Sequence, residues 1–225
     1  MLKQNIYILL LLLNINLLSG QEIITAERYL EMVSNRFIEV RDFQANIAIR
    51  SGDSNMAGTI SYSSPSTFRM DFTQPAQQMI LFNSETLTVY IPELNAVLTQ
   101  SVNQTRRSGT SSTNTQGLNT LRRNYVPSYL ISPHPVPLDP NSREHVIKLR
   151  LTRRSVSEGF REIILSIDPN TRLIRRMEGK TIGDETVIFD LTNIITNQGI
   201  NSRRFIFDIP ASANVYNDFL INKSD

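Results

Sequence analysis

The side chains that most often carry out chemistry in proteins are scarce in this sequence. There is no cysteine, which excludes a thiol nucleophile, a disulfide framework, a cysteine-ligated metal and a lipidated cysteine anchor. The two histidines are His134, which lies between two prolines, and His145, which stands at the head of an expected strand. We interpret both as surface residues and expect no metal site and no cofactor.

The familiar catalytic motifs are also missing. Zinc-type His-x-x-x-His, calcium-loop and Gly-x-Ser-x-Gly patterns do not occur. Gly179-Lys180-Thr181 resembles the end of a phosphate-binding loop, but the upstream glycine is missing. Asp71, Asp168 and Asp190 occupy alternating or turn positions, where solvation explains them. We therefore expect no catalytic residue, and an enzyme is disfavoured.

Arginine pairs are the most unusual feature of the charge distribution, although the formal net charge is only +2. Such pairs suggest nucleic-acid binding, but no aromatic-and-basic RNA motif accompanies them, and we expect no nucleic-acid partner. They are either solvated strand ends or a rim that favours acidic lipid head groups and partner proteins. The pairs are Arg106-Arg107, Arg122-Arg123, Arg153-Arg154, Arg175-Arg176 and Arg203-Arg204.

The first twenty residues have the composition of a secretory signal peptide. Lys3 is followed by an apolar stretch and by small residues at the end of the segment, as in cleaved signals. The stretch is interrupted by Asn14 and Asn16 and is too short to span ~30 Å of hydrocarbon. Gln21 stands where a bacterial lipoprotein would have cysteine. We expect a signal peptide at residues 1–20 and a soluble, periplasmic domain at residues 21–225.

The elements of this domain are one helix followed by many strands. Ala26, Leu30, Val33 and Phe37 recur at helical spacing after the capping residue Thr25. From Phe43 the period changes to two. About eleven strands, joined mostly by short turns, predict an antiparallel meander that curls or closes into a barrel. They are expected at residues 43–49, 56–62, 68–72, 78–82, 86–91, 96–101, 144–151, 161–168, 172–178, 186–194 and 203–208.

The middle of the chain breaks this pattern. Residues 102–117 are almost wholly polar and are expected to form a mobile insertion. Leu118, Leu121 and Tyr125 then fall on one face of a short helix that ends at Pro127. A short apolar helix after a polar loop predicts either a lid or an ordinary surface excursion.

An ordered series of motifs gives the sequence its resemblance to a known family. Residues 57–92 read AGTISYSSPSTFRMDFTQPAQQMILFNSETLTVYIP, and residues 205–210 read FIFDIP. This order is similar to that of the outer-membrane lipoprotein carrier protein family, the LolA-like periplasmic chaperones. The resemblance implies an incomplete, strongly curved antiparallel β-barrel covered by a helical lid. It also implies that an apolar cavity carries acylated lipoproteins from the inner membrane to the outer membrane.

One position departs from the family pattern. Family members have a functionally important arginine directly before the proline that matches Pro65, and here the residue is Ser64. Arg69 is therefore the candidate residue for latching the lid. Leu118, Leu121 and Tyr125 are the lid candidates. The candidates for the acyl-chain cavity are Phe68, Met70, Phe72, Met79, Leu81, Leu87 and Val89.

The resemblance also implies the partners. They are acylated lipoproteins, an inner-membrane lipoprotein-releasing ABC exporter and an outer-membrane lipoprotein acceptor, and a monomer is expected. Two alternatives stay open: a lipid- or lipoprotein-sensing regulatory domain of the same fold, and a structural envelope protein or an enzyme.

Overall fold

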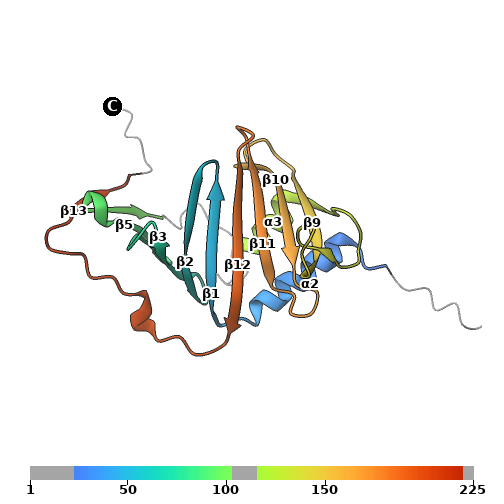
Figure 1. The fold of residues 1–225 in the computed structure, drawn as a ribbon, viewed down its shortest axis with the longest axis horizontal. Helices are drawn as coiled ribbons and strands as arrows, with labels where there is room; N and C mark the ends of the chain where they lie inside the picture. Colours follow the sequence, from blue (N-terminus) through green and yellow to red (C-terminus); the bar gives the residue numbers. More distant parts are fainter. Residues whose placement is uncertain (1–22, 103–115, 220–225) are drawn as a thin grey trace, which may run out of the picture.

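A computed structural model describes residues 23–102 and 116–219 of the chain. Twelve strands follow one another in a single sheet in the order β13-β6-β5-β4-β3-β2-β1-β12-β11-β10-β9-β7, and β8 pairs with β9 beside this path. Figure 1 shows the strands side by side in one twisted, open sheet, with the two helices behind it. The expected architecture, an incomplete barrel with helices on one face, is confirmed.

The strands and helices have the following bounds. The first half contains α2 (Ala26–Ile38), β1 (Asp42–Ser51), β2 (Ser54–Ser63), β3 (Thr67–Gln74), β4 (Met79–Asn83), β5 (Thr86–Ile91), the 3₁₀ turn η1 (Pro92–Leu94) and β6 (Ala96–Ser101). The second half contains α3 (Gln116–Asn124), β7 (Tyr125–Tyr129), β8 (Val136–Pro137), β9 (His145–Arg153), β10 (Phe160–Ile167), β11 (Ile174–Thr181), β12 (Thr186–Thr196), the 3₁₀ turn η4 (Ser202–Phe205) and β13 (Asn214–Asn217).

The opening helix forms as its sequence predicts. Thr25 is the N-cap, and its hydroxyl accepts a hydrogen bond from the backbone N–H of Arg28 at 3.2 Å. Ala26, Leu30 and Val33, which share the apolar stripe, are buried, as is Val40 just beyond the helix.

The prediction of a strand at residues 203–208 was wrong. Ser202–Phe205 form a 3₁₀ turn, and the chain then runs over the sheet without pairing. The apolar run from Phe205 to Phe207 resembles a strand, but Phe207 instead packs its ring on Tyr90 of β5. The next strand along the chain is β13, which pairs with β6 in parallel.

The residues directly after α3 form a strand, β7, where the sequence predicted only the end of a helix. β7 is the last strand on its side of the sheet and pairs with β9. The N–H of Leu130 and the carbonyl of Asn124 bond to β9, so by alternation Pro127 turns its nitrogen to the other edge. Its missing N–H therefore costs no hydrogen bond to β9, and the proline is compatible with this edge strand.

Register assigns side chains to the two faces of the sheet. Residues paired across strands share a face, and Phe43 of β1 pairs with Tyr62 of β2, which pairs with Phe68 of β3. Phe37 of α2 contacts both Phe43 and Tyr62. We call this face, which the helix covers, the inner face, and the opposite face the outer face.

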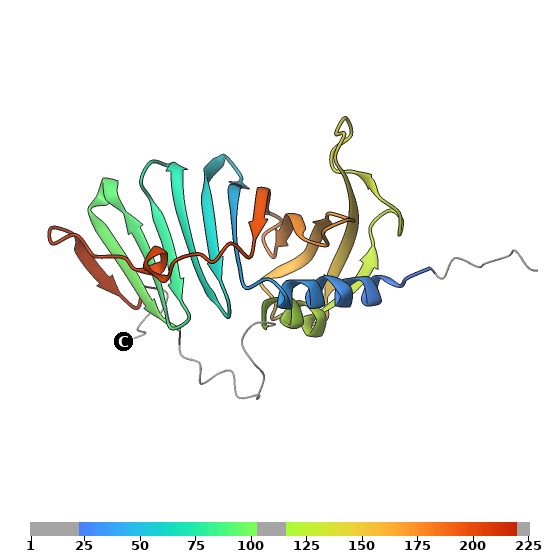
Figure 2. The ribbon, with the colours of Figure 1, turned by 90° about the horizontal axis from the view of Figure 1, so that it is seen from below.

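Two apolar clusters lie on the inner face. The larger one packs Tyr29, Leu30 and Val33 of α2 against buried residues of β7, β9 and β10, among them Leu149 and Leu165. The smaller one joins Val40 and Phe43 to neighbours on β1 and β2. Figure 2 shows both helices under the half of the sheet that contains β9 to β11, while β2 to β6 extend away from them.

Two expectations lie mainly outside the described residues. The expected signal peptide at residues 1–20 falls there, and so does most of the polar insertion at residues 102–117. Among the described residues, no helix is both long enough and apolar enough to cross a membrane.

Candidate functional site

Two rows of apolar side chains cross the strands on the inner face, and together we call them the apolar track. One row runs through Tyr62, Phe68, Phe82 and Leu87, each paired with the next. The other runs through Ile60, Met70, Ile80, Val89 and Leu98. On β3 to β6 these side chains are only half-buried. Within the described part of the chain, α2 and α3 lie on the other half of the sheet.

The track brings together most of the residues predicted from sequence. Phe68, Met70, Leu87 and Val89 line it, and Phe72 shares their face at the end of β3, where it is buried. Phe68 and Phe82 pack with their ring centroids 5.7 Å apart. Sequence reasoning missed Ile80 and Phe82. The short turn between β4 and β5 could have identified them, because it places Phe82 opposite Leu87.

Met79 and Leu81 lie on the outer face, away from the other five cavity candidates. Met79 pairs with Asp71 and Tyr90, and Leu81 pairs with Arg69 and Thr88. Both are more deeply buried than the track, with 3% and 5% of their surface exposed. They therefore belong to a different layer of the molecule.

The C-terminal segment, residues 201–219, covers this layer. The guanidinium of Arg204 binds the carboxylate of Asp71 and the hydroxyl of Ser61, which lie on the outer faces of β3 and β2. The ring of Phe207 packs on Tyr90 of β5 at 5.3 Å, and β13 continues the sheet beside β6. The segment thus runs over strands β2 to β6 on the face opposite to the track.

Arg69, the candidate latch, fastens this segment. Its guanidinium donates to the carbonyl oxygens of Arg204 and Ile206 at 3.3 and 3.0 Å and pairs with Asp71 at 2.9 Å. Arg69 is on the outer face, whereas the helices are on the inner face. In the structure, Arg69 therefore contacts the C-terminal segment, whereas the sequence predicted that it would contact a helical lid.

The three lid candidates lie on the larger cluster rather than over β3 to β6. Leu118 and Leu121 of α3 pack against that cluster, and Tyr125 at the start of β7 is buried within it. The Tyr125 hydroxyl donates to the carbonyl of Phe160 at 3.1 Å. Movement of α3 over the track stays a prediction.

Burial affects the ionisation of tyrosines on the inner side of the molecule. Burial raises the pKa of Tyr29 to about 12, and burial also raises the pKa of Tyr62. Both phenols are therefore protonated at neutral pH.

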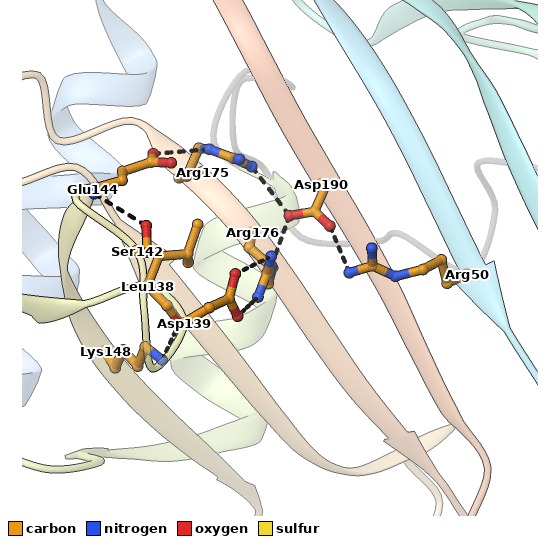
Figure 3. A network of polar contacts seen from close by, with 9 residues as sticks. All are labelled: Arg50, Leu138, Asp139, Ser142, Glu144, Lys148, Arg175, Arg176 and Asp190. Atoms are coloured by element: carbon orange, nitrogen blue, oxygen red, sulfur yellow. Dashed lines mark hydrogen bonds and ion pairs between the residues drawn. The ribbon is translucent and has the colours of Figure 1, made fainter.

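The charged groups gather on the outer face instead. Asp190 of β12 accepts from Arg50, Arg175 and Arg176, as Figure 3 shows. Arg176 also forms a two-bond pair with Asp139, and Arg175 binds Glu144 at 2.8 Å. The interpretation of solvated arginine pairs was wrong for Arg176, because it is 8% exposed. Three guanidinium groups and the nearby ammonium of Lys148, which donates to the carbonyl of Leu138 at 2.7 Å, accompany three carboxylates in this network.

The residues considered for chemistry remain apart from one another. His134 and His145 are exposed, and the carboxylate of Asp168 accepts the backbone N–H groups of Asn170 and Thr171. Within residues 23–102 and 116–219, no group of three His, Asp or Glu side chains is arranged to hold a metal ion. What the described arrangement offers is an apolar surface.

Comparison with solved structures gives matches in fold at low sequence identity. An uncharacterized conserved protein from Thermus thermophilus is 12% identical with a TM-score of 0.55, and the match covers 83% of this chain and 98% of that one. A chain of the Pseudomonas aeruginosa MucA/MucB complex is 13% identical with a TM-score of 0.52, and the match covers 84% of this chain and 62% of that one. A LolA superfamily protein from Nitrosomonas europaea is 14% identical with a TM-score of 0.41, covering 81% and 98%. At these identities the first two matches show a shared fold.

Comparison by sequence is more specific. Curated proteins gave no match to this chain. The model of the family described as outer membrane lipoprotein carrier protein LolA, however, matches residues 49–208. These residues run from β1 to the segment that Arg69 fastens, and they include the whole apolar track on β2 to β6. The chain therefore belongs to the LolA family of outer membrane lipoprotein carrier proteins.

Proposed function

We propose that this protein is a periplasmic carrier that shields the acyl chains of lipoproteins on their way from the inner membrane to the outer membrane. The apolar track is the observation that carries the proposal. Its side chains on β3 to β6 are half-buried, and they form a continuous surface across four strands. Family membership over residues 49–208 supports the same function.

The physical need for such a surface follows from the cargo. Each buried methylene of an acyl chain contributes about 0.8 kcal/mol, so a protein with two or three chains leaves a membrane only if another apolar surface accepts them. Met70 offers an unbranched, polarizable side chain on the β3 part of the track, which suits chains of variable structure.

The partners follow from this function. An inner-membrane lipoprotein-releasing ABC exporter would load the carrier, and an outer-membrane lipoprotein acceptor would unload it. We propose that the carrier works as a monomer, without a cofactor and without catalysis. Cleavage of residues 1–20 would release it into the periplasm.

A charge placed on the track tests the proposal. Leu87→Glu puts a carboxylate on the inner face of β5, and Thr88→Glu puts the same group on the outer face one residue later. Because an unpaired charge is costly against an acyl chain, Leu87→Glu should weaken binding of a triacylated lipoprotein by at least about ten-fold. Thr88→Glu should leave binding within about two-fold of the original protein.

Native mass spectrometry of the protein mixed with a purified triacylated lipoprotein would measure both affinities, and circular dichroism would check that each variant folds. Equal affinities for the two folded variants would reject the track as the acyl site. Failure of the unmodified protein to bind any acylated lipoprotein would reject the proposed function itself.

A further inference from the structure

Three aromatic rings lie at the end of the apolar track that is formed by β2. Phe37 of α2 lies 6.2 Å from Phe43 of β1 and 5.9 Å from Tyr62 of β2, measured between ring centroids. The rings of Phe43 and Tyr62 are stacked at 5.2 Å. We call these three residues the aromatic wall. They join the last full turn of the helix to the first two strands of the sheet.

Burial changes across this wall. On the side of β1, Ala45 and Ile47 are buried, with 4% of each exposed, and they belong to the smaller cluster under α2. Ile60 of β2, which is also buried in this cluster, continues the row of Ala45, and Met70 of β3 packs against the cluster while only half-buried. Ile80 and Val89, also half-buried, continue this row away from the cluster. An acyl chain that lies along the track from β6 toward β2 would therefore meet the wall where the helix begins to cover the sheet.

The length of the track is close to the length of one acyl chain. From β2 to β6 there are four inter-strand spacings of about 4.8 Å, or about 19 Å in all. A bilayer core of about 30 Å holds two layers of chains, so one chain spans about 15 Å. A chain of ordinary membrane length would thus fit between β6, where the track ends, and the wall with little room beyond it.

We infer that the aromatic wall, and Phe37 above all, is a stop that sets the longest acyl chain the carrier can shield fully. The inference deepens the proposed function and rests on it. Methylenes added to a chain that already reaches the wall must remain outside the track, in contact with water. Each methylene up to that length should raise affinity about four-fold, and those beyond it should add little.

Phe37 is well placed for this role because it comes from the helix. Phe43 and Tyr62 belong to the strands that build the sheet, and the Tyr62 hydroxyl also donates to the carbonyl of Pro65 at 3.1 Å. Removing the Phe37 ring would open a path toward Val40 and Leu173, the apolar side chains of the smaller cluster, without changing a strand.

Saturated fatty acids of increasing length are the probes for this inference. Affinities of lauric, myristic, palmitic and stearic acid would be measured by displacement of a fluorescent fatty acid. In the original protein, affinity should rise with length and then level off. In Phe37→Ala, the levelling-off should move to a longer acid, so that stearic acid gains at least about four-fold relative to myristic acid.

Two further variants serve as controls. Phe68→Ala makes the same truncation on the open part of the track, and it should weaken all four acids similarly without moving the levelling-off. Met70→Trp adds bulk one strand nearer to the open edge, and it should move the levelling-off to a shorter acid. If Phe37→Ala does not fold, Phe37→Leu removes the ring while keeping an apolar side chain.

The outcomes separate the two claims. If Phe37→Ala or Phe37→Leu folds and keeps the original length profile, the stop is rejected while the carrier function stands. Affinity in the original protein that keeps rising to stearic acid would reject the stop as well. If the original protein binds none of the acids and no acylated lipoprotein, both the stop and the proposed function fail.

Discussion

Gly58 lies at a bulge between β2 and β3, where the two backbones approach closely. A Cβ at this position would lie 2.1 Å from the carbonyl oxygen of Asp71 and 2.8 Å from the Cα of Phe72. Backbone atoms cannot rotate away as a side chain can, so the strands would have to separate. We predict that Gly58→Ala lowers the free energy of unfolding by about 1–3 kcal/mol, measured by urea denaturation.

Gly159, in the turn between β9 and β10, provides the control for that measurement. A Cβ there would meet no atom within 4 Å. Gly159→Ala should change the free energy of unfolding by no more than about 0.5 kcal/mol. Equal effects of the two substitutions would mean that the close approach at Gly58 is relieved at little cost.

Single residues also show where sequence reasoning reaches its limit. The alternation on β3 correctly assigned Phe68, Met70 and Phe72 to one face. On β4 the run from Met79 to Phe82 is apolar throughout, because the track uses one face and the C-terminal segment covers the other. A strand covered on both faces has no polar side to reveal its register, so the faces of Met79 and Leu81 could not be read from their own sequence.

Among the elements, the C-terminal segment depends on a small group of charges. Asp71 accepts from both Arg69 and Arg204, and these two arginines hold the segment at β3. Asp71→Asn removes the charge and keeps the shape. We predict that amide hydrogen exchange in residues 201–208 becomes about ten-fold faster in this variant, measured by mass spectrometry of that peptide.

Asp53→Asn is the matched control, because Asp53 is exposed in the turn between β1 and β2. It should leave exchange in residues 201–208 unchanged. Unaltered exchange in Asp71→Asn would show that the apolar contact of Phe207 with Tyr90 is sufficient to hold the segment.

The helix α3 carries the lid prediction at this scale. Leu118 and Leu121 pack on the larger cluster, so a lid role requires α3 to leave that position and reach the track. Arg122 of α3 and Glu31 of α2 form an ion pair at 3.9 Å, which identifies a point where the helices meet. Cysteines at these two positions, joined by a short bismaleimide, should hold α3 in place and block acyl uptake.

The same double-cysteine protein without the reagent should bind acylated lipoprotein normally, as measured by native mass spectrometry. If the cross-linked, folded protein takes up cargo as well as the uncross-linked one, α3 is not a lid. Leu118, Leu121 and Tyr125 would then serve only the core beneath α2.

Across the whole molecule, contacts between distant parts of the chain were the least predictable from sequence. Hairpins between neighbouring strands follow from alternation and turns, and β1 to β6 agree with their expected positions to within a few residues. The pairing of β1 with β12 joins residues more than a hundred positions apart, and no local pattern encodes it. Arg176 meets Asp190 across the β11–β12 hairpin, but the contact of Arg50 with Asp190 depends on the pairing of β1 with β12. For the arginine pairs, the sequence had suggested only solvated strand ends or a rim for acidic lipids and partner proteins.

This same network ties the connector before β9 to the sheet, and it makes stability depend on pH. Hydrogen bonds from Arg176 hold the pKa of Asp139 below its usual range. A carboxyl group with a lowered pKa in the folded state stabilises the protein above the unfolded pKa of about 4, and this stabilisation is lost as the pH falls through the folded value.

Asp139→Asn should therefore be less stable than the original protein at neutral pH, and the difference in the free energy of unfolding should shrink below about pH 4. Urea denaturation at neutral pH and at about pH 3 would measure it, with Asp53→Asn as the control. A difference that stays constant between the two pH values would show that the charge on Asp139 does not anchor the connector.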